Sequence, residues 1–196
     1  MLTWLMSVDR DVFLYLNGLH QPWLDNFMWL CSGTLLWLPL YAFLIYLLIK
    51  KFKKQSWILI FALALLFFLS DFISSGIIKQ AVMRLRPSHD DSLVGLVHLF
   101  KKSNGEFYSG GLYGFVSSHA ANTFALATFI SLVFRKKWFS ISVFAWAVLV
   151  SYSRIYLGVH YPGDIIGGVV VGIFSGFVVY LVLAYVQRAY FKQDKV

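Results

Sequence analysis

Five apolar runs, each of about 20 residues, constrain the fold of this sequence more than any other feature. They cover roughly residues 27–49, 57–83, 118–134, 138–156 and 164–186. A helix needs about 20 mostly apolar residues to cross the hydrocarbon core of a bilayer. The sequence therefore predicts an all-α membrane bundle of about five transmembrane helices, and Pro39 is expected to kink the first of them.

Composition argues against a soluble globular protein. Of the 196 residues, 59% are hydrophobic and only 13% are charged, whereas about 25% are charged in a typical soluble domain. The net charge of +8 resides in short clusters between the apolar runs and forms no continuous stripe. We therefore expect one membrane-embedded domain over residues 1–196, with membrane lipids and no nucleic acid as partners.

The basic clusters predict an orientation. They lie at residues 50–54, 135–137 and 188–195, after the first, third and fifth apolar runs. Five passes place all three on one side, and the excess of Lys and Arg makes that side cytoplasmic. The loop of residues 84–117 and the turn before the fifth run then face outward. We expect the chain to lie in a bacterial inner membrane, with these segments on the periplasmic side.

The N-terminal residues 1–22 show a different pattern. Apolar side chains share one helical face: Val12, Phe13, Leu16 and Leu19. Polar side chains lie elsewhere: Asp9, Arg10 and Asn17. This pattern is typical of a helix lying in the membrane interface, although a short ordered tail fits it equally well.

Ionisable residues within the second run indicate function, because a charge at membrane depth is costly. Asp71, Ser75 and Lys79 form a polar stripe, and Arg86 follows almost in register with Lys79 before Pro87 stops the helix. Snorkelling toward lipid phosphates explains the two cations equally well when they are taken alone. For Asp71 we expect a helix–helix hydrogen bond, or one with Ser75 of its own helix.

Two further segments carry polar groups at the outer side. Ser117, Ser118 and His119 open the third run, where a serine N-cap and free backbone N–H groups can bind an anion. Arg154 ends the fourth run. His160 then precedes Asp164 by four residues, a spacing that lets the carboxylate hold the imidazole and leave its other nitrogen free.

These residues resemble the motifs of the type 2 phosphatidic acid phosphatase family. The family pattern Lys-x6-Arg-Pro is matched by Lys79, Arg86 and Pro87, and Ser-Arg-x5-His-x3-Asp is matched from Ser153 to Asp164. The remaining motif, Pro-Ser-Gly-His, departs at two positions, since Val116 replaces the proline and Ser118 the glycine. The matched blocks cover about half of the chain in the family's order and spacing.

The resemblance implies a metal-independent lipid phosphatase with no cofactor. In such an enzyme His160 would attack phosphorus and form a phosphohistidine, oriented by Asp164, while His119 would protonate the leaving oxygen and then activate water. The implied phosphate-binding residues are Lys79, Arg86, Ser117, Ser118 and Arg154. The implied substrate is a lipid phosphate: undecaprenyl pyrophosphate, phosphatidylglycerophosphate, phosphatidic acid or lipid A. We expect the loop of residues 88–115, with Tyr108 and Tyr113, to select among them.

Other readings remain open at this point. A divalent metal could be bound by loop residues, namely His89, Asp90, Asp91 and His98. A vanadium haloperoxidase would use the same pocket, but the family's haloperoxidases are soluble. A non-catalytic lipid-phosphate binding or transport protein is the main alternative. Gly168, Gly172 and Gly176 predict close helix packing within the bundle or, alternatively, dimerisation; the sequence does not define the oligomeric state.

Overall fold

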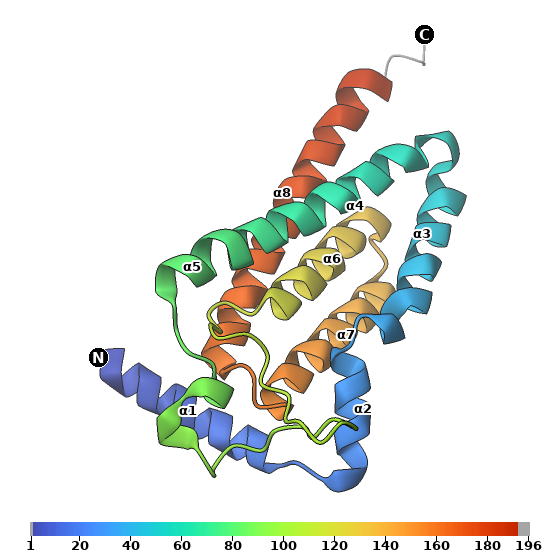
Figure 1. Cartoon of the computed structure of the whole chain (residues 1–196). Helices are drawn as coiled ribbons and strands as arrows, with labels where there is room; N and C mark the ends of the chain where they lie inside the picture. Colours follow the sequence, from blue (N-terminus) through green and yellow to red (C-terminus); the bar gives the residue numbers. More distant parts are fainter. Residues whose placement is uncertain (1, 192–196) are drawn as a thin grey trace.

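The computed structural model describes residues 2–191, which fold into helices joined by one long loop (Figure 1). The all-α prediction is confirmed for these residues, whose only β-pairings are two isolated bridges within the loop. Lys192 and Lys195 of the third basic cluster lie outside the described residues. The helices are α1 (Leu2–Gly18), α2 (Pro22–Ser32), α3 (Leu38–Phe52), α4 (Ser56–Asp71), the π-helix η3 (Phe72–Ile78), α5 (Lys79–Val82), α6 (Ser118–Phe134), α7 (Lys137–Tyr156) and α8 (Pro162–Phe191).

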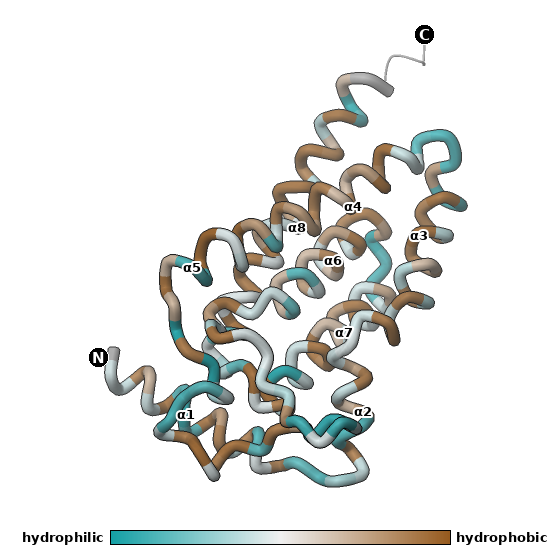
Figure 2. The backbone as a smooth tube through the Cα atoms, viewed as in Figure 1, coloured by the Kyte–Doolittle hydropathy of each residue, from teal (hydrophilic) through white to brown (hydrophobic). Residues whose placement is uncertain are grey.

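Three helical stretches are long and apolar enough to cross a membrane: Leu35–Val82, Lys137–Tyr156 and Pro162–Ala189. The first of them reverses direction between α3 and α4, and its two halves diverge from that turn (Figure 1). The shorter apolar helix α6 lies among them. Hydrophobic residues follow these helices along most of their length (Figure 2).

Helix α6 forms the centre of the bundle and packs closely against α8. A Cβ atom added at Gly172 would lie 2.5 Å from the carbonyl oxygen of Ala121, and one at Gly176 would lie 2.7 Å from that of Ala125. Such contacts are too short for a side chain, so the glycines bring the two backbones together. The prediction of glycine packing within the bundle is confirmed.

The first predicted span is broken, contrary to expectation. Helix α2 ends at Ser32, and the chain resumes a helical path only with the short 3₁₀ helix Leu35–Trp37 and then α3. Pro39 lies in the first turn of α3, where its missing N–H costs no helical hydrogen bond, and therefore causes no kink. The break at Gly33 and Thr34 instead lets the chain line a cavity next to α6.

The prediction that the apolar face of the N-terminal helix lies in the membrane interface is also wrong in part. In α1, Phe13 is fully buried against the protein, and Asn17 is only 1% exposed. The Asn17 amide donates hydrogen bonds to the carbonyl oxygens of Ile155 and Tyr156. Asn17 thus points inward because the protein supplies partners for it, which the apolar pattern alone does not reveal.

The two ends of the bundle differ in character (Figures 1 and 2). The turn between α3 and α4 and the turn between α6 and α7, which carry the first two basic clusters, lie toward one end. Lys51 there donates to the carbonyl oxygen of Val133 (2.9 Å). The loop of residues 83–117, helix α1 and the start of α8 lie at the opposite end, where the candidate site is found.

Candidate active site

The turn between α7 and α8 holds His160, which is 1% exposed. Gly158 lets the turn form, because its φ of +75° is strained for other residues and a Cβ there would lie 2.7 Å from the carbonyl oxygen of His98. His160 Nδ1 lies 3.3 Å from Asp164 Oδ2, as the four-residue spacing predicts. Since an ionised carboxylate only accepts hydrogen bonds, this contact places the proton on Nδ1 and leaves the Nε2 lone pair free.

Asp164 is fully buried and has two further donors. Its Oδ2 accepts from the backbone N–H of Tyr161 (3.0 Å), and its Oδ1 accepts from Arg84 Nη1 (3.2 Å). Arg84 Nη2 in turn lies 2.8 Å from Asp9 Oδ2 in α1. An ionic chain therefore runs from the N-terminal helix to the imidazole of His160.

Sequence reasoning missed Arg84 and Asp9. Arg84 lies within the six unspecified positions of the Lys-x6-Arg-Pro pattern, and Asp9 is 75 residues away from it in the sequence. Asp9 Oδ1 also accepts from the N–H of Gly163 (2.7 Å), a free N–H in the first turn of α8. A buried carboxylate such as Asp164 needs a partner, but the sequence pattern does not identify which cation supplies it.

Lys79 is brought to the site by the π-helix η3, seven residues long, which lies between it and Asp71. Lys79 Nζ donates to Ser118 Oγ (3.2 Å), and the Ser118 hydroxyl lies 2.6 Å from that of Ser75. Ser75 Oγ donates to Asp71 Oδ1 (3.2 Å), which confirms the predicted contact within that helix. The hydroxyl of Ser118, at the position where the family has glycine, thus links α6 to the helix that carries Lys79.

Arg86 reaches the site from the loop. The prediction that it continues the helix of Lys79 is wrong, because α5 ends at Val82 and Met83 adopts a left-handed conformation. The extended residue Arg86 is 8% exposed, and its Nε donates to the carbonyl oxygen of Tyr113 (3.0 Å). Gly110 makes room for its guanidinium group, since a Cβ at Gly110 would overlap Nη1.

Arg154 lies near the end of α7 and is 2% exposed. Its Nη1 donates to Ser32 Oγ at the end of α2, and its Nη2 donates to Tyr108 Oη in the loop (2.9 Å). Its Nε has no partner among the described residues. An arginine that is buried with a free donor can bind one oxygen of an anion.

Ser117 caps α6, as predicted: its Oγ accepts from the N–H of Ala120. Its own N–H donates to the carbonyl oxygen of Asp164 (2.9 Å), so the start of α6 is fixed to the start of α8. Ser118 and His119 follow in the first turn, where unpaired backbone N–H groups favour an anion.

The electrostatic environment of His160 shows that the cations converge on it. Burial and the positive charges of Arg86, Arg154 and Lys79 hold the pKa of His160 well below its usual value of 6.5. The imidazole is therefore neutral at physiological pH, which is the form in which a histidine can act as a nucleophile. The structure thus brings together all eight predicted site residues around one position: Lys79, Arg86, Ser117, Ser118, His119, Arg154, His160 and Asp164.

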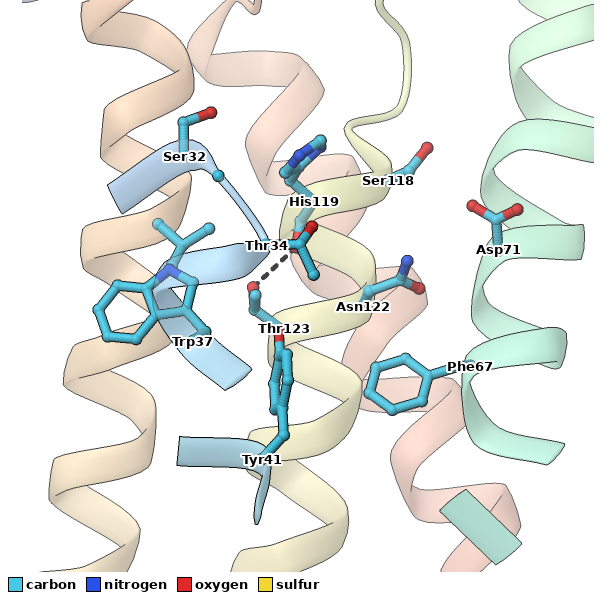
Figure 3. Close-up of a pocket in the computed structure, with 12 residues that line it drawn as sticks. Ser32, Thr34, Trp37, Tyr41, Phe67, Asp71, Ser118, His119, Asn122 and Thr123 are labelled. Carbon is cyan, nitrogen blue, oxygen red and sulfur yellow. Dashed lines mark hydrogen bonds between the residues drawn. The ribbon is translucent and has the colours of Figure 1, made fainter. Parts of the chain in front are cut away.

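Two cavities flank His119, and both reach the break between α2 and α3. One, of about 480 Å³, extends past Arg154 and Tyr108. The other, of about 500 Å³, lies between α3, α4 and α6 (Figure 3). Its lining is mostly apolar, with a few polar groups that include Asp71 and Asn122, a composition typical of ligand sites.

The loop residues considered as metal ligands take other partners. Asp90 accepts from Ser92 and from Tyr161 Oη (2.9 Å), whereas His98 Nε2 lies 3.1 Å from Asp25 in α2. Within residues 2–191 no group of three His, Cys, Asp or Glu side chains is arranged to hold a metal ion. The contacts of Asp90 and His98 instead attach the loop to Tyr161 and to α2.

The sequence matches the PAP2 superfamily over residues 55–188. It is 39% identical to the lipid A 4′-phosphatase of Bacteroides thetaiotaomicron over 93% of this chain and 80% of that protein. It is also 39% identical to the lipid A 4′-phosphatase of Porphyromonas gingivalis, over 94% of this chain and 76% of that protein. A solved transmembrane PAP2-type phosphatidylglycerolphosphate phosphatase from Bacillus subtilis aligns with a TM-score of 0.69 at 24% identity, covering 94% and 88% of the two chains.

Proposed function

Since this chain belongs to the PAP2 superfamily and is a multi-pass membrane phosphatase, we propose that it removes the 4′-phosphate of a lipid A-type glycolipid at the outer face of a bacterial inner membrane. The observation that carries the chemistry is His160, held by Asp164 with Nε2 free and surrounded by the charges of Arg86 and Arg154. The relatives named lipid A 4′-phosphatases support the substrate, because each aligns over more than nine-tenths of this chain.

The first step is attack of His160 Nε2 on phosphorus. The bond between phosphorus and the lipid oxygen breaks, and a phosphohistidine forms. His119 donates a proton to the leaving lipid oxygen. Asp164 stabilises the positive charge that develops on the His160 ring, and Arg84 holds Asp164 in place through its 3.2 Å contact.

The second step returns the enzyme to its starting state. His119, now neutral, takes a proton from a water molecule, which attacks phosphorus and releases inorganic phosphate from His160. Lys79, Arg86 and Arg154 bind the phosphate oxygens in both steps. Positioning and stabilisation of negative charge account for most of the catalysis in phosphoryl transfer, so the cations supply what a metal ion supplies in other phosphatases.

The test is phosphate release by the purified protein in detergent, with EDTA, from four lipids: lipid A, phosphatidic acid, phosphatidylglycerophosphate and undecaprenyl pyrophosphate. We expect lipid A to be the best substrate and His160→Ala to lose at least about a thousandfold in rate. His20→Ala, which changes an exposed histidine outside the site, should retain full activity.

Three results would contradict parts of this proposal. Dependence on added divalent metal would contradict the metal-independent mechanism. Full activity of His160→Ala would contradict the assignment of His160 as the nucleophile. Preference for another lipid of the panel would leave the chemistry in place and contradict the substrate.

A further inference from the structure

Asp71 has no place in the mechanism above, yet it lines the larger cavity beside His119 (Figure 3). It lies eight residues before Lys79, on the order of 10 Å deeper along an apolar span. A carboxylate at such depth is costly unless it has partners or water. Asp71 is exposed and lines the cavity, so its charge is not buried in the bundle.

The partners of Asp71 leave hydrogen-bonding capacity unused. Ser75 donates to Oδ1, and it is the only hydrogen-bond donor that contacts the Asp71 carboxylate within residues 2–191. A carboxylate has about four acceptor positions. Most of the capacity of Asp71 therefore faces the cavity.

A second unsatisfied group lies across the cavity from Asp71. Asn122, on α6, directs its amide toward the space between α6 and α4 (Figure 3). Asn122 lines the cavity, and its buried Oδ1 has no hydrogen-bond partner among the described residues. A ligand that enters here meets the free acceptor positions of Asp71 and the amide of Asn122, and it satisfies the carboxylate only by bringing hydroxyl or amide N–H donors.

The position of this pair relative to His119 identifies which part of a substrate they meet. In the proposed mechanism the phosphate lies among His160, Arg86 and Arg154, and His119 faces the bond that breaks. The cavity begins at Ser118 and His119 and continues to Asn122 and Asp71. Of the two cavities at His119, only this one also includes Ser118, which Lys79 contacts, and we therefore assign the first atoms of the leaving group to it.

We propose that Asp71 and Asn122 recognise hydrogen-bond donors on the leaving group, and that the occupant is an acylated amino sugar, whose hydroxyl and amide groups supply those donors. This inference rests on the proposed function, because it assumes that the site cleaves a lipid phosphate. It goes further by naming the residues that discriminate between a glycolipid phosphate and phosphatidic acid. The diacylglycerol leaving group of phosphatidic acid carries no hydrogen-bond donor before cleavage.

The experiment compares two substrates in mixed micelles: a diacylated glucosamine 4-phosphate and dioleoyl phosphatidic acid. kcat/KM is measured for the wild type, Asp71→Leu, Asp71→Asn and Asn122→Leu. Phe72→Leu is the matched control, because Phe72 is the next residue, is 52% exposed and does not line the cavity.

For Asp71→Leu we expect kcat/KM for the sugar phosphate to fall at least about tenfold, since a donor–carboxylate contact is lost. Asp71→Asn, which keeps an acceptor, should lose less. Turnover of phosphatidic acid should stay within about twofold of wild type for every variant, which also shows that the variants fold. Phe72→Leu should match the wild type on both substrates.

Any other outcome contradicts the inference. The activity of the wild type on the two substrates shows whether the proposed function fails with it. Equal losses on both substrates would mean that Asp71 is structural, for instance as a counter-charge for Lys79. If kcat/KM does not fall on either substrate, or if the wild type cleaves phosphatidic acid alone, the cavity does not bind the sugar of the leaving group. A wild type that cleaves neither lipid would contradict the proposed function as well.

Discussion

His160 is buried and bonded to a carboxylate, whereas His119 lies where two cavities meet. The first environment suits a nucleophile whose orientation must not change. The second gives access to the leaving oxygen and then to water, as a group that exchanges protons in both steps requires. The two histidines should therefore respond differently to substitution.

His119→Ala should separate the two steps of the reaction. With p-nitrophenyl phosphate, whose leaving group departs without protonation, the first step should proceed while the second slows by about a hundredfold or more. Phosphoenzyme should then accumulate, detectable as acid-labile, base-stable label after a rapid quench. His160→Ala gives no label under the same conditions if it removes the nucleophile, and label in that variant would place the phosphate elsewhere.

The environment of His160 also predicts a pH effect on stability. Burial and the charges of Arg86, Arg154 and Lys79 lower its pKa in the folded protein from 6.5. The unfolded chain therefore binds the proton more tightly, so that stability is kept above about pH 6.5 and declines as the pH falls toward the lower, folded-state pKa, by at most about 1.4 kcal/mol per pH unit.

The measurement is the apparent Tm of wild type and of His160→Gln between about pH 7.5 and about pH 5.5. The variant cannot bind this proton, so the wild type should lose Tm relative to it as the pH is lowered. A constant difference across the range would show that folding does not perturb the pKa of His160.

Single residues were the level at which the sequence was most informative. The spacings of the three motifs predicted eight side chains around one position, and the structure brings them together. Asp9 and Arg84 were not predictable, because their contact depends on how α1 docks. The bonds from the Ser118 hydroxyl to Ser75 and Lys79 were equally hidden, since they need the π-helix to place those two residues.

At the level of elements, α1 is attached to the site by polar contacts. Asp9 accepts from Gly163 at the start of α8 and pairs with Arg84, which holds Asp164. The guanidinium of Arg84 also stacks on the ring of Tyr161, 3.9 Å from its centroid. A loosened α1 would therefore disturb the carboxylate that orients His160.

Asp9→Ala should lower kcat by about tenfold and the stability by about 1–3 kcal/mol, because it leaves Arg84 and the Gly163 N–H without an acceptor. Asp9→Asn keeps an acceptor for Gly163 and should recover part of the loss. The control is Asp11→Ala, an exposed carboxylate on the same helix. Detergent-solubilised kcat and Tm report both effects, and equal behaviour of the Asp9 and Asp11 variants would contradict a role for this contact.

Helix positions were predicted well where apolar runs are long and capped. Helix α6 begins at Ser118 after its serine cap, as expected, and α8 begins at Pro162, two residues before the predicted run. The break between α2 and α3 was missed, because Gly33 and Thr34 lie within a continuous apolar run and only the adjacent cavity explains the break. The end of α5 at Val82 was missed because the following residues bond with the loop, as Arg86 does with Tyr113.

For the whole molecule, the basic turns and the candidate site lie at opposite ends of the bundle (Figure 1). The excess of Lys and Arg predicts that their end is cytoplasmic. The sequence was sufficient for this separation because apolar runs and charge clusters alternate simply along the chain. It was not sufficient for the docking of α1 across the site end, which depends on contacts between distant residues.

The orientation can be tested with single cysteines in a Cys31→Ser background, since Cys31 is the only cysteine of the chain. Asn104→Cys lies in the long loop and Lys136→Cys in the turn between α6 and α7. In intact bacterial cells a membrane-impermeant maleimide should label position 104 and reach position 136 only after lysis. Labelling of position 136 alone in intact cells would show that the protein has the opposite orientation.

The contact between Asp9 and Gly163 joins residues 154 positions apart. Asp9 is made early in translation, whereas Gly163 leaves the ribosome only when most of the chain is already in the bilayer. Until residues 160–164 have been made, the nascent protein has neither His160 nor Asp164, and Asp9 lacks its contact with Gly163. The ionic chain Asp9–Arg84–Asp164, which leads to His160, is therefore completed only when the start of α8 joins a helix made at the other end of synthesis.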